Sequence, residues 1–312
     1  MVEGPCRVLV TGGAGFIGRA LTARLVRGGA HVTVLDDLSS GDASRLDPTV
    51  RLIEGSVTDL DQVMAAARDV DAVFHLAAIA SVTRCNADLA ASHRVNLGGF
   101  VNVLEAAILQ PVRPALVYAS SAAVYGDNPD TPLVEAAPPR PLSPYGADKL
   151  GCELHAAAAA TVHGVRSTGL RFFNVYGPGQ DPGSPYSGVI SRFHSLTIRG
   201  EGLTIFGDGL QTRDFVFVED VVDALIAAAG RQAGPEAEVL NVCTGLETSL
   251  LDLARQLGEV SRRKVRISHA EGRAGDIRRS AGSPDRLTRT LGARPTTDLT
   301  TGLRILVEQG AD

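Results

Sequence analysis

Several features are scarce or missing in this sequence of 312 residues. No apolar run approaches the ~18–20 residues that cross a membrane. The N-terminus lacks the charged segment and long apolar stretch of a signal peptide. The net charge of −5 is too small to indicate nucleic-acid binding. The four cysteines, at 6, 85, 152 and 243, show neither a CxxC pair nor metal-ligand spacing, so we expect reduced thiols in the cytoplasm and no metal, membrane or nucleic-acid partner.

Lysine is also almost absent. Of the 30 basic residues only two are lysine, which leaves 28 arginines. Lys149 stands four residues after Tyr145, and residues at this spacing share one face of a helix. An ammonium there can stabilise a phenolate, which turns a tyrosine into a general base. By itself the spacing also fits an exposed tyrosine beside a solvated lysine, so the catalytic interpretation depends on the other motifs.

A glycine-rich turn follows the first apolar segment. Residues 7–11 (RVLVT) have the pattern of a buried strand, glycines stand at 12, 15 and 18, and an amphipathic stretch over 16–26 ends at Gly28-Gly29. Glycines at this spacing allow a tight turn, close approach of a pyrophosphate and close helix–strand packing, with the phosphates at the helix N-terminus. Because the turn follows a strand and opens a helix, it predicts a dinucleotide site.

A carboxylate ends the second expected strand. Residues 31–35 (HVTVL) lead to Asp36, 18 residues after Gly18. A carboxylate at this place can accept hydrogen bonds from the adenosine ribose hydroxyls, and it repels a 2′-phosphate. No arginine occurs in the next residues, Asp37 to Ser40. The sequence therefore predicts NAD rather than NADP as the cofactor.

Strand-like and helix-like segments alternate along the chain, which is typical of a parallel sheet covered on both faces. Further strands are expected at 51–54, 72–76, 115–120 and 167–172, and helices at 60–67, 92–109 and 146–163. After about residue 173 the pattern changes: residues 177–185 are rich in glycine and proline, and a strand returns at 214–218. We predict an α/β fold, with a Rossmann-type doubly wound parallel sheet (1–174, with 213–246 returning to it) and a smaller C-terminal α/β lobe (175–212 and 247–312).

Recognisable motifs occur in order along nearly the whole chain: TGGAGFIG (11–18), Asp36, GSVTD (55–59), HLAA (75–78), SSAAVYG (120–126), YGADK (145–149), RFFNVYG (171–177), GDG (207–209) and RDF (213–215). In this order they resemble an extended short-chain dehydrogenase/reductase of the NAD-dependent nucleotide-sugar epimerase/dehydratase family. The resemblance is greatest to UDP-hexose 4-epimerases. It implies that the smaller lobe binds the nucleotide sugar.

The resemblance also implies a role for each matching residue. Tyr145 and Lys149 would form the catalytic pair, and Ser121 would donate a hydrogen bond to the reacting sugar oxygen. The cofactor site would comprise Gly12, Gly15, Phe16, Ile17, Gly18, Asp36, Val57, Asp59, Leu76, Ala77 and Ala78, together with Tyr145 and Lys149. The substrate would be held by Ser121, Asn174, Arg213, Arg273, Asp276 and Ser280, with a guanidinium on the phosphate oxygens.

The same resemblance bears on the reaction. In the family's sugar 4,6-dehydratases an Asp-Glu pair follows the catalytic serine, whereas this chain has Ala122-Ala123. Alanine cannot transfer a proton, so elimination lacks its acid and base. The implied activity is 4-epimerisation of a nucleoside-diphosphate hexose through a transient 4-keto sugar, with tightly bound NAD. A dehydratase or 4-reductase of the same fold, a dTDP-hexose 4-epimerase and a non-enzymatic NAD-binding protein are the alternatives.

The resemblance narrows the substrate less far. UDP is the more common nucleotide of the group, and Ser280 falls at a gate beside the sugar's C2 substituent. A small residue there admits an N-acetyl group, so both UDP-glucose/UDP-galactose and UDP-GlcNAc/UDP-GalNAc fit. Uronate relatives tend to have an arginine near Asp181, which disfavours a glucuronate, and Gly179 replaces an arginine common in that loop. The family usually pairs through two helices, here 92–109 and 146–163, so a homodimer is expected.

Overall fold

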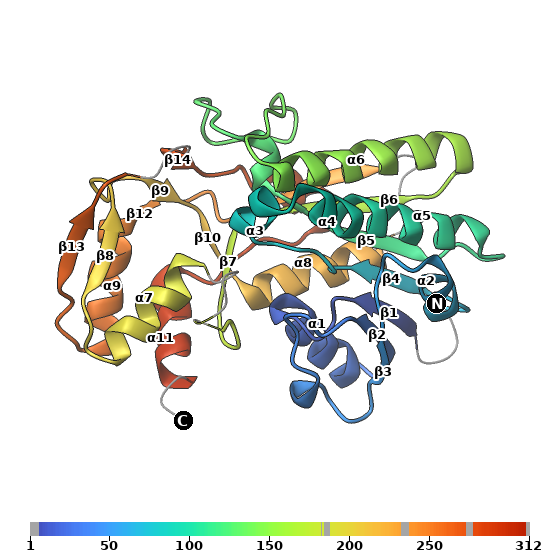
Figure 1. Cartoon of the computed structure of the whole chain (residues 1–312), viewed down its shortest axis with the longest axis horizontal. Coiled ribbons are helices and arrows are strands. Elements are labelled where there is room, and N and C mark those ends of the chain that lie inside the picture. The colour runs from blue at the N-terminus through green and yellow to red at the C-terminus, as the bar shows by residue number, and fades with distance from the viewer. Residues whose placement is uncertain (1–5, 182, 184–187, 232–236, 273–276, 310–312) are drawn as a thin grey trace.

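A seven-stranded sheet forms the centre of the larger lobe (Figure 1). The computed structural model describes residues 6–181, 183, 188–231, 237–272 and 277–309. All neighbouring strands of this sheet run parallel, which confirms the expected doubly wound α/β fold. From edge to edge the strands are β3 (Arg51–Glu54), β2 (His31–Asp36), β1 (Arg7–Thr11), β4 (Ala72–His75), β5 (Ala115–Ser121), β6 (Ser167–Phe172) and β11 (Glu238–Val242).

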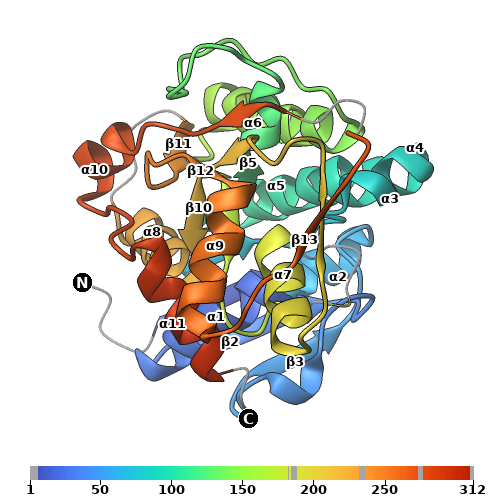
Figure 2. The same ribbon diagram turned by 90° about the vertical axis from the view of Figure 1, so that its left-hand side faces the viewer.

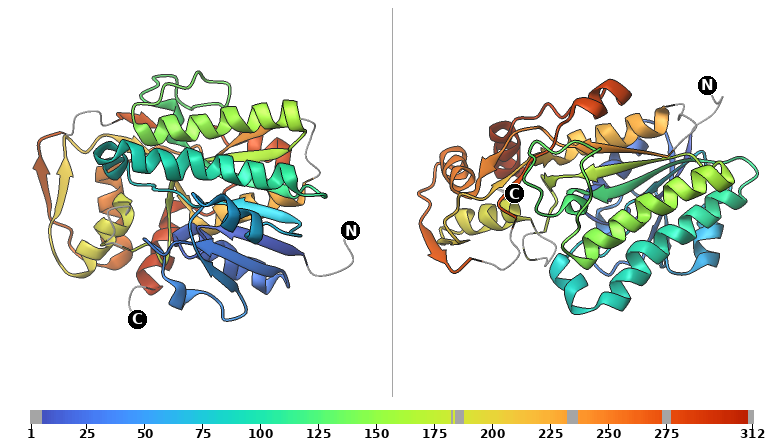
Figure 3. Two further views of the ribbon diagram at one scale, coloured as in Figure 1. Left: turned by 45° about the vertical axis from the view of Figure 1, so that its right-hand side comes forward. Right: turned by 90° about the horizontal axis from the view of Figure 1, so that it is seen from above.

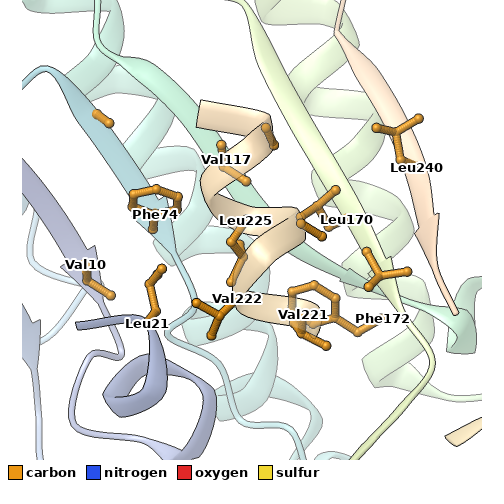
Figure 4. Packing of buried hydrophobic residues seen from close by; sticks show 14 of the residues in the cluster. Val10, Leu21, Phe74, Val117, Leu170, Phe172, Val221, Val222, Leu225 and Leu240 are labelled. Carbon is orange, nitrogen blue, oxygen red and sulfur yellow. The ribbon is translucent and has the colours of Figure 1, made fainter. Parts of the chain in front are cut away.

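Helices cover both faces of this sheet. Val8 and Val10 of β1 pack with α1 (Phe16–Arg27) and α8 (Val218–Gly230) in one apolar cluster, part of which Figure 4 shows. Leu9, between them, packs on the opposite face with α2 (Leu60–Ala66), α5 (Gly99–Leu109) and α6 (Pro144–His163). Because both faces of the sheet are buried at β1, its sequence is a nearly continuous apolar run, which makes this strand recognisable in the sequence.

The helix expected over 92–109 is interrupted. The structure has α3 (Val82–Ala87), α4 (Leu89–His93), a π-helical turn (Arg94–Gly98) and then α5. The side chain of Asn96 in this turn bonds to the backbone of Ile79, and such contacts compete with regular helix formation. The strand expected over 214–218 is also shorter, because β10 covers Phe215–Phe217 and Val218 already begins α8.

A smaller lobe packs beside the carboxyl edge of the sheet (Figures 1 and 2). Its own apolar cluster joins α7 (Val189–Ile198), β8 (Leu203–Phe206), α9 (Leu250–Ser261) and α11 (Leu299–Gln309). β13 (Ile267–Ala270) pairs with β8, and β7 (Asn174–Tyr176) pairs with β10. β9 (Thr212–Arg213) lies between β12 (Thr248–Ser249) and β14 (Arg279–Ser280), and α10 covers Asp285–Leu291. Among the described residues, no helix has the length and apolar character needed to span a membrane.

Candidate active site

The site residues expected from separate motifs gather at one edge of the main sheet. Parallel strands place their carboxyl ends on the same side, where open α/β sheets bind ligands. Gly12 directly follows β1, Asp36 ends β2, Leu76 follows β4 and Ser121 ends β5. The Gly12 amide donates a hydrogen bond to the Leu35 carbonyl oxygen at 2.9 Å, which holds the first two strand ends together.

The three glycines of the first turn have different tasks. A Cβ atom at Gly12, where φ is +70°, would lie 2.6 Å from the Ala77 nitrogen, and one at Gly18 would lie 2.2 Å from the Gly12 oxygen. Packing within the chain therefore requires both glycines. At Gly15 the sole contact within 4 Å, among the described residues, would be the Gly12 oxygen at 3.3 Å. The space beside Gly15 is thus left open for a ligand.

Helix α1 points its N-terminus at this open space. It begins at Phe16 and Ile17, directly after Gly15, and the described structure shows no side-chain cap and no acidic residue in its first turn. First-turn amides have no acceptor inside the helix, and the aligned peptide dipoles favour an anion. This end of α1, with the room beside Gly15, therefore fits a pyrophosphate.

Asp36 stands next to the glycine turn and is 8% exposed. Its Oδ2 accepts a hydrogen bond from the Ala14 amide and its Oδ1 accepts one from the Leu38 amide, both at 2.9 Å. Burial raises the pKa of Asp36, while these two hydrogen bonds act in the opposite direction. Each carboxylate oxygen keeps a lone pair for a further donor, so the residue fits a ribose hydroxyl.

Two further residues expected in the cofactor site, Val57 and Asp59, lie just before α2. Val57 is buried, whereas Asp59 is exposed and caps the helix. The Asp59 oxygens accept from the backbone nitrogen of Gln62 at 3.1 Å and from its Nε2 at 2.9 Å. Asp59 thus has a structural task of its own, and its part in binding the cofactor stays a prediction.

Asn96 positions the segment after β4, and the sequence analysis did not identify it. Leu76, Ala77 and Ala78 leave the strand in irregular backbone, and Ile79 follows them. The fully buried Asn96 accepts from the Ile79 amide at 2.8 Å and donates Nδ2 to the Ile79 oxygen at 3.3 Å. The adjacent Gly98-Gly99 pair was the one available signal that the helix breaks here.

Ser121, Tyr145 and Lys149 come from β5 and the first turns of α6. Ser121 Oγ accepts a hydrogen bond from the Ala123 amide at 3.1 Å, which leaves its proton to donate. Tyr145 is half-buried, and the Lys149 ammonium lies 5.8 Å from the centre of its ring. Lys149 is 2% exposed. Lys149 therefore lies inside the protein rather than on a solvated helix face.

The turn after Ser121 touches the start of α6. Residues Ala122–Tyr125 form a 3-10 turn, and a Cβ atom at Gly146 would lie 2.7 Å from the Ala123 oxygen. This close approach brings Tyr145 beside the end of β5. Ala122 and Ala123 offer no group that can transfer a proton.

His75 is the last residue of β4, the strand next to β5, and is 1% exposed. Its Nδ1 lies 2.8 Å from Thr11 Oγ1, and its Nε2 is buried with no hydrogen-bond partner among the described residues. Burial, with a smaller contribution from the positive charge of Lys149, lowers the pKa of His75 to about 3. The imidazole is therefore neutral at physiological pH.

The expected substrate residues line short strands between the two lobes. Ser280 of β14 pairs in register with Arg213 of β9, whose Nη1 donates to the Thr212 and Ile277 oxygens at 2.8 Å. Asn174 begins β7, where its backbone amide donates to the backbone carbonyl oxygen of Asp214 at 3.0 Å. Arg273 and Asp276 lie outside the described residues.

Asp214 joins these segments and was not identified from the sequence as a site residue. It is fully buried, and its Oδ1 accepts from the Thr244 amide at 2.8 Å and from Thr244 Oγ1 at 2.7 Å. Its Oδ2 accepts from the amides of Gly245 and Gly282 at 2.9 and 3.4 Å. Burial raises the pKa of this carboxyl, and the four hydrogen bonds oppose that shift. One side chain thus holds together β10, the turn after β11 and the segment after β14.

The sequence is similar to a known protein family and to proteins with a named activity. Residues 8–243 match the model of the NAD dependent epimerase/dehydratase family. A UDP-glucose 4-epimerase of Mycolicibacterium smegmatis is 37% identical over 308 residues, which cover 97% of each chain.

Two solved structures share the fold over nearly the whole length. The UDP-glucose 4-epimerase of Thermotoga maritima, solved with UDP-glucose, is 35% identical, with a TM-score of 0.93 and coverage of 98% of each chain. The UDP-N-acetylglucosamine 4-epimerase of Methanobrevibacter ruminantium, solved with UDP-N-acetylmuramic acid, is 33% identical, with a TM-score of 0.93 and coverage of 99% of each chain.

Proposed function

The chain belongs to the NAD-dependent epimerase/dehydratase family, and on that premise we propose that it is an NAD-dependent 4-epimerase of UDP-hexoses. The observation that supports the proposal is that Lys149 lies beside the ring of Tyr145 and donates a hydrogen bond to Ala119 of β5, the strand that ends at Ser121. The relatives named above, which are 4-epimerases, support the same reaction.

Each of the three side chains has a separate task in this reaction. Tyr145, as a phenolate, takes the proton from the sugar 4-hydroxyl, and the Lys149 ammonium keeps that phenolate low in energy. Ser121 donates a hydrogen bond to the reacting oxygen and holds it in place. When bound, NAD would accept the hydride from C4 and would supply it again to the opposite face, and Tyr145 then returns the proton to the sugar oxygen. The nucleotide diphosphate stays anchored while the 4-keto sugar turns within the site.

The cofactor would be held by residues whose geometry fits it. The first turn of α1 and the space beside Gly15 would take the pyrophosphate, and Asp36 would take the ribose hydroxyls. The negative charge of Asp36 disfavours a 2′-phosphate. On the substrate side, Arg213 and Asn174 would bind the diphosphate, with Arg273 and Asp276 contributing from outside the described residues.

Epimerisation is favoured over dehydration by Ala122 and Ala123. Removal of water across C5 and C6 needs a proton donor and a proton acceptor beside the sugar, and alanine provides neither. A dehydratase of the same family is the second candidate. Its product would be lighter by one water, which makes the two reactions easy to separate.

The sugar and the assembly are finer parts of the proposal. Ser280 is small and lies next to Arg213 in register, which supports room for either a hydroxyl or an N-acetyl group at C2. Helices α5 and α6 lie side by side on the outside of the sheet (Figure 3), with Leu154 and Val162 of α6 63% and 72% exposed. These apolar side chains support a homodimer through α5 and α6. The cytoplasmic location and the lobe boundaries (1–174 with 213–246; 175–212 with 247–312) stay predictions.

A product analysis tests the proposal. The purified full chain is incubated with UDP- and dTDP-hexoses without added reductant, and products are examined by proton NMR and mass spectrometry. We expect an isobaric product with altered H4 couplings from a UDP-hexose. A product lighter by water would identify a dehydratase and would contradict our interpretation of Ala122 and Ala123.

A further inference from the structure

Glu153 lies one helical turn beyond Lys149 on α6 and is 7% exposed. Arg171 of β6, which is 5% exposed, donates Nε to Glu153 Oε1 at 2.8 Å and Nη2 to Oε2 at 2.7 Å. Two parallel hydrogen bonds fix the direction of a carboxylate as well as its position. This pair therefore sets how α6 is rotated against the sheet.

Arg171 is itself held from the other side. Its Nη1 donates to the Tyr125 hydroxyl at 2.7 Å and to the Glu135 oxygen at 3.2 Å, and the guanidinium lies 4.7 Å from the centre of the Tyr125 ring. The Tyr125 hydroxyl donates in turn to Asn241 Oδ1 at 2.6 Å. Burial lowers the pKa of Arg171, but hydrogen bonds to Glu153 and Tyr125 and the negative charge of Glu153 outweigh this effect and raise it. The cation is fixed by β6, β11 and the turn after Ser121.

The same carboxylate also reaches the end of β5. Ser120 Oγ, which is fully buried, donates to Glu153 Oε1 at 2.5 Å. Ser120 directly precedes Ser121 in β5. Ala119, the residue before Ser120, accepts a hydrogen bond from Lys149. Two contacts, one helical turn apart on α6, thus tie successive residues of β5 to the helix that carries Tyr145.

We propose that Glu153 is a positioning residue that sets the placement of Ser121 relative to Tyr145 and Lys149. The inference rests on the proposed function, in which these three side chains touch the substrate. An ion pair is not needed for stability here, because buried pairs replaced by well-packed apolar residues are often as stable or more so. What an apolar pair cannot provide is a directed acceptor for Ser120. Glu153 supplies that acceptor, and Arg171 fixes its orientation.

The test removes this one contact and leaves the ion pair in place. Ser120→Ala is compared with Ser167→Ala, which deletes the same atom from the neighbouring strand. Ser167 is 2% exposed, and its Oγ has no hydrogen-bond partner within the described chain. In Ser120→Ala we expect kcat for a UDP-hexose to fall by about ten-fold or more, because small displacements of a catalytic group slow the reaction strongly. KM should change by less than about two-fold, since substrate contacts are kept.

Melting temperature and NAD content are measured on both variants. We expect equal NAD content in the two variants and a lower melting temperature for Ser120→Ala, because it alone loses a hydrogen bond to a charged group. The loss of kcat, expressed per folded protein, should be confined to Ser120→Ala. Equal kcat in the two variants would overturn the inference, and so would a loss in Ser120→Ala that merely follows a lower content of folded protein. Glu153→Gln is the second variant. Because this substitution leaves Arg171 without a counter-charge, the variant can fail to fold. In that case the result for Ser120→Ala alone tests the inference. If the unaltered protein turns over no nucleoside-diphosphate hexose, the proposed function is wrong and the inference falls with it.

Discussion

The Lys149 ammonium donates a hydrogen bond to the Ala119 carbonyl oxygen, 2.8 Å away, and so anchors α6 to β5 from inside the protein. Lys149→Met should therefore remove both this anchor and the charge that stabilises the phenolate. We expect turnover of a UDP-hexose to fall by about 100-fold or more. Lys264→Met, at the other, exposed lysine, is the matched control and should keep full activity. Similar activities in both variants would contradict the role of Lys149.

Tyr145→Phe should abolish turnover while leaving the cofactor site intact. The substitution removes the oxygen that takes the 4-hydroxyl proton and keeps the ring that packs at the start of α6. We expect kcat to fall by about 10²–10⁴-fold, the usual range for loss of general acid–base catalysis. NAD content, measured after denaturation of the purified variant, should equal that of the unaltered protein. Unchanged turnover would refute the mechanism.

The elements that the sequence predicted well are those set by local patterns. β1, β3 and β6 begin and end where expected. β1 is the clearest case, because its buried apolar residues end at a glycine-rich turn. The interruption before α5 was missed because it depends on a contact between Asn96 and Ile79, 17 positions apart in the chain. The Gly98-Gly99 pair is a local signal for a break in the helix, but no local pattern records the contact itself.

The residues of the site divide in the same way, into those set by a local pattern and those set by distant contacts. Gly12, Gly15 and Asp36 belong to a short motif whose spacing has a physical meaning, so they could be named in advance. Asp214 and Glu153 act through partners 30 or more and 18 or more positions away, respectively. In the sequence each is one acidic residue among 35. Only the fold distinguishes these buried carboxylates from the solvated ones.

Asp36→Asn should weaken NAD binding. The amide replaces a charged acceptor by a neutral one, and hydrogen bonds to charged groups contribute about 1.5–3 kcal/mol. We expect the Kd for NAD, measured by calorimetry on cofactor-free protein, to rise by about ten-fold or more. The discrimination against NADP should shrink, because the repulsion of its 2′-phosphate is removed. Asp37→Asn, at the exposed neighbour, serves as control, and an equal effect there would contradict the assignment of Asp36.

His75 should make the fold sensitive to mild acid. Its pKa is lowered from 6.5 to about 3 in the folded protein, so its contribution to stability is fully present above pH 6.5 and is lost as the pH falls toward 3. Between pH 7 and 5 this loss amounts to about 2 kcal/mol of unfolding free energy. His75→Gln should lack this loss. The difference in unfolding free energy between the variant and the unaltered protein, measured by urea titration, should therefore change by about 2 kcal/mol between pH 7 and pH 5. An equal change in His163→Gln, at an exposed histidine, would refute the assignment to His75.

Ser280→Tyr should change which sugar is accepted. Ser280 is 9% exposed on β14 and pairs with Arg213, so a tyrosine at this position would fill the space proposed for an N-acetyl group. We expect kcat/KM for UDP-GlcNAc to fall by about ten-fold or more relative to that for UDP-glucose, because steric exclusion acts on the larger substituent alone. Ser280→Ala keeps the site small and should leave the ratio unchanged. Equal losses for both sugars in Ser280→Tyr would mean that the side chain disturbs the strand pair rather than a gate at C2.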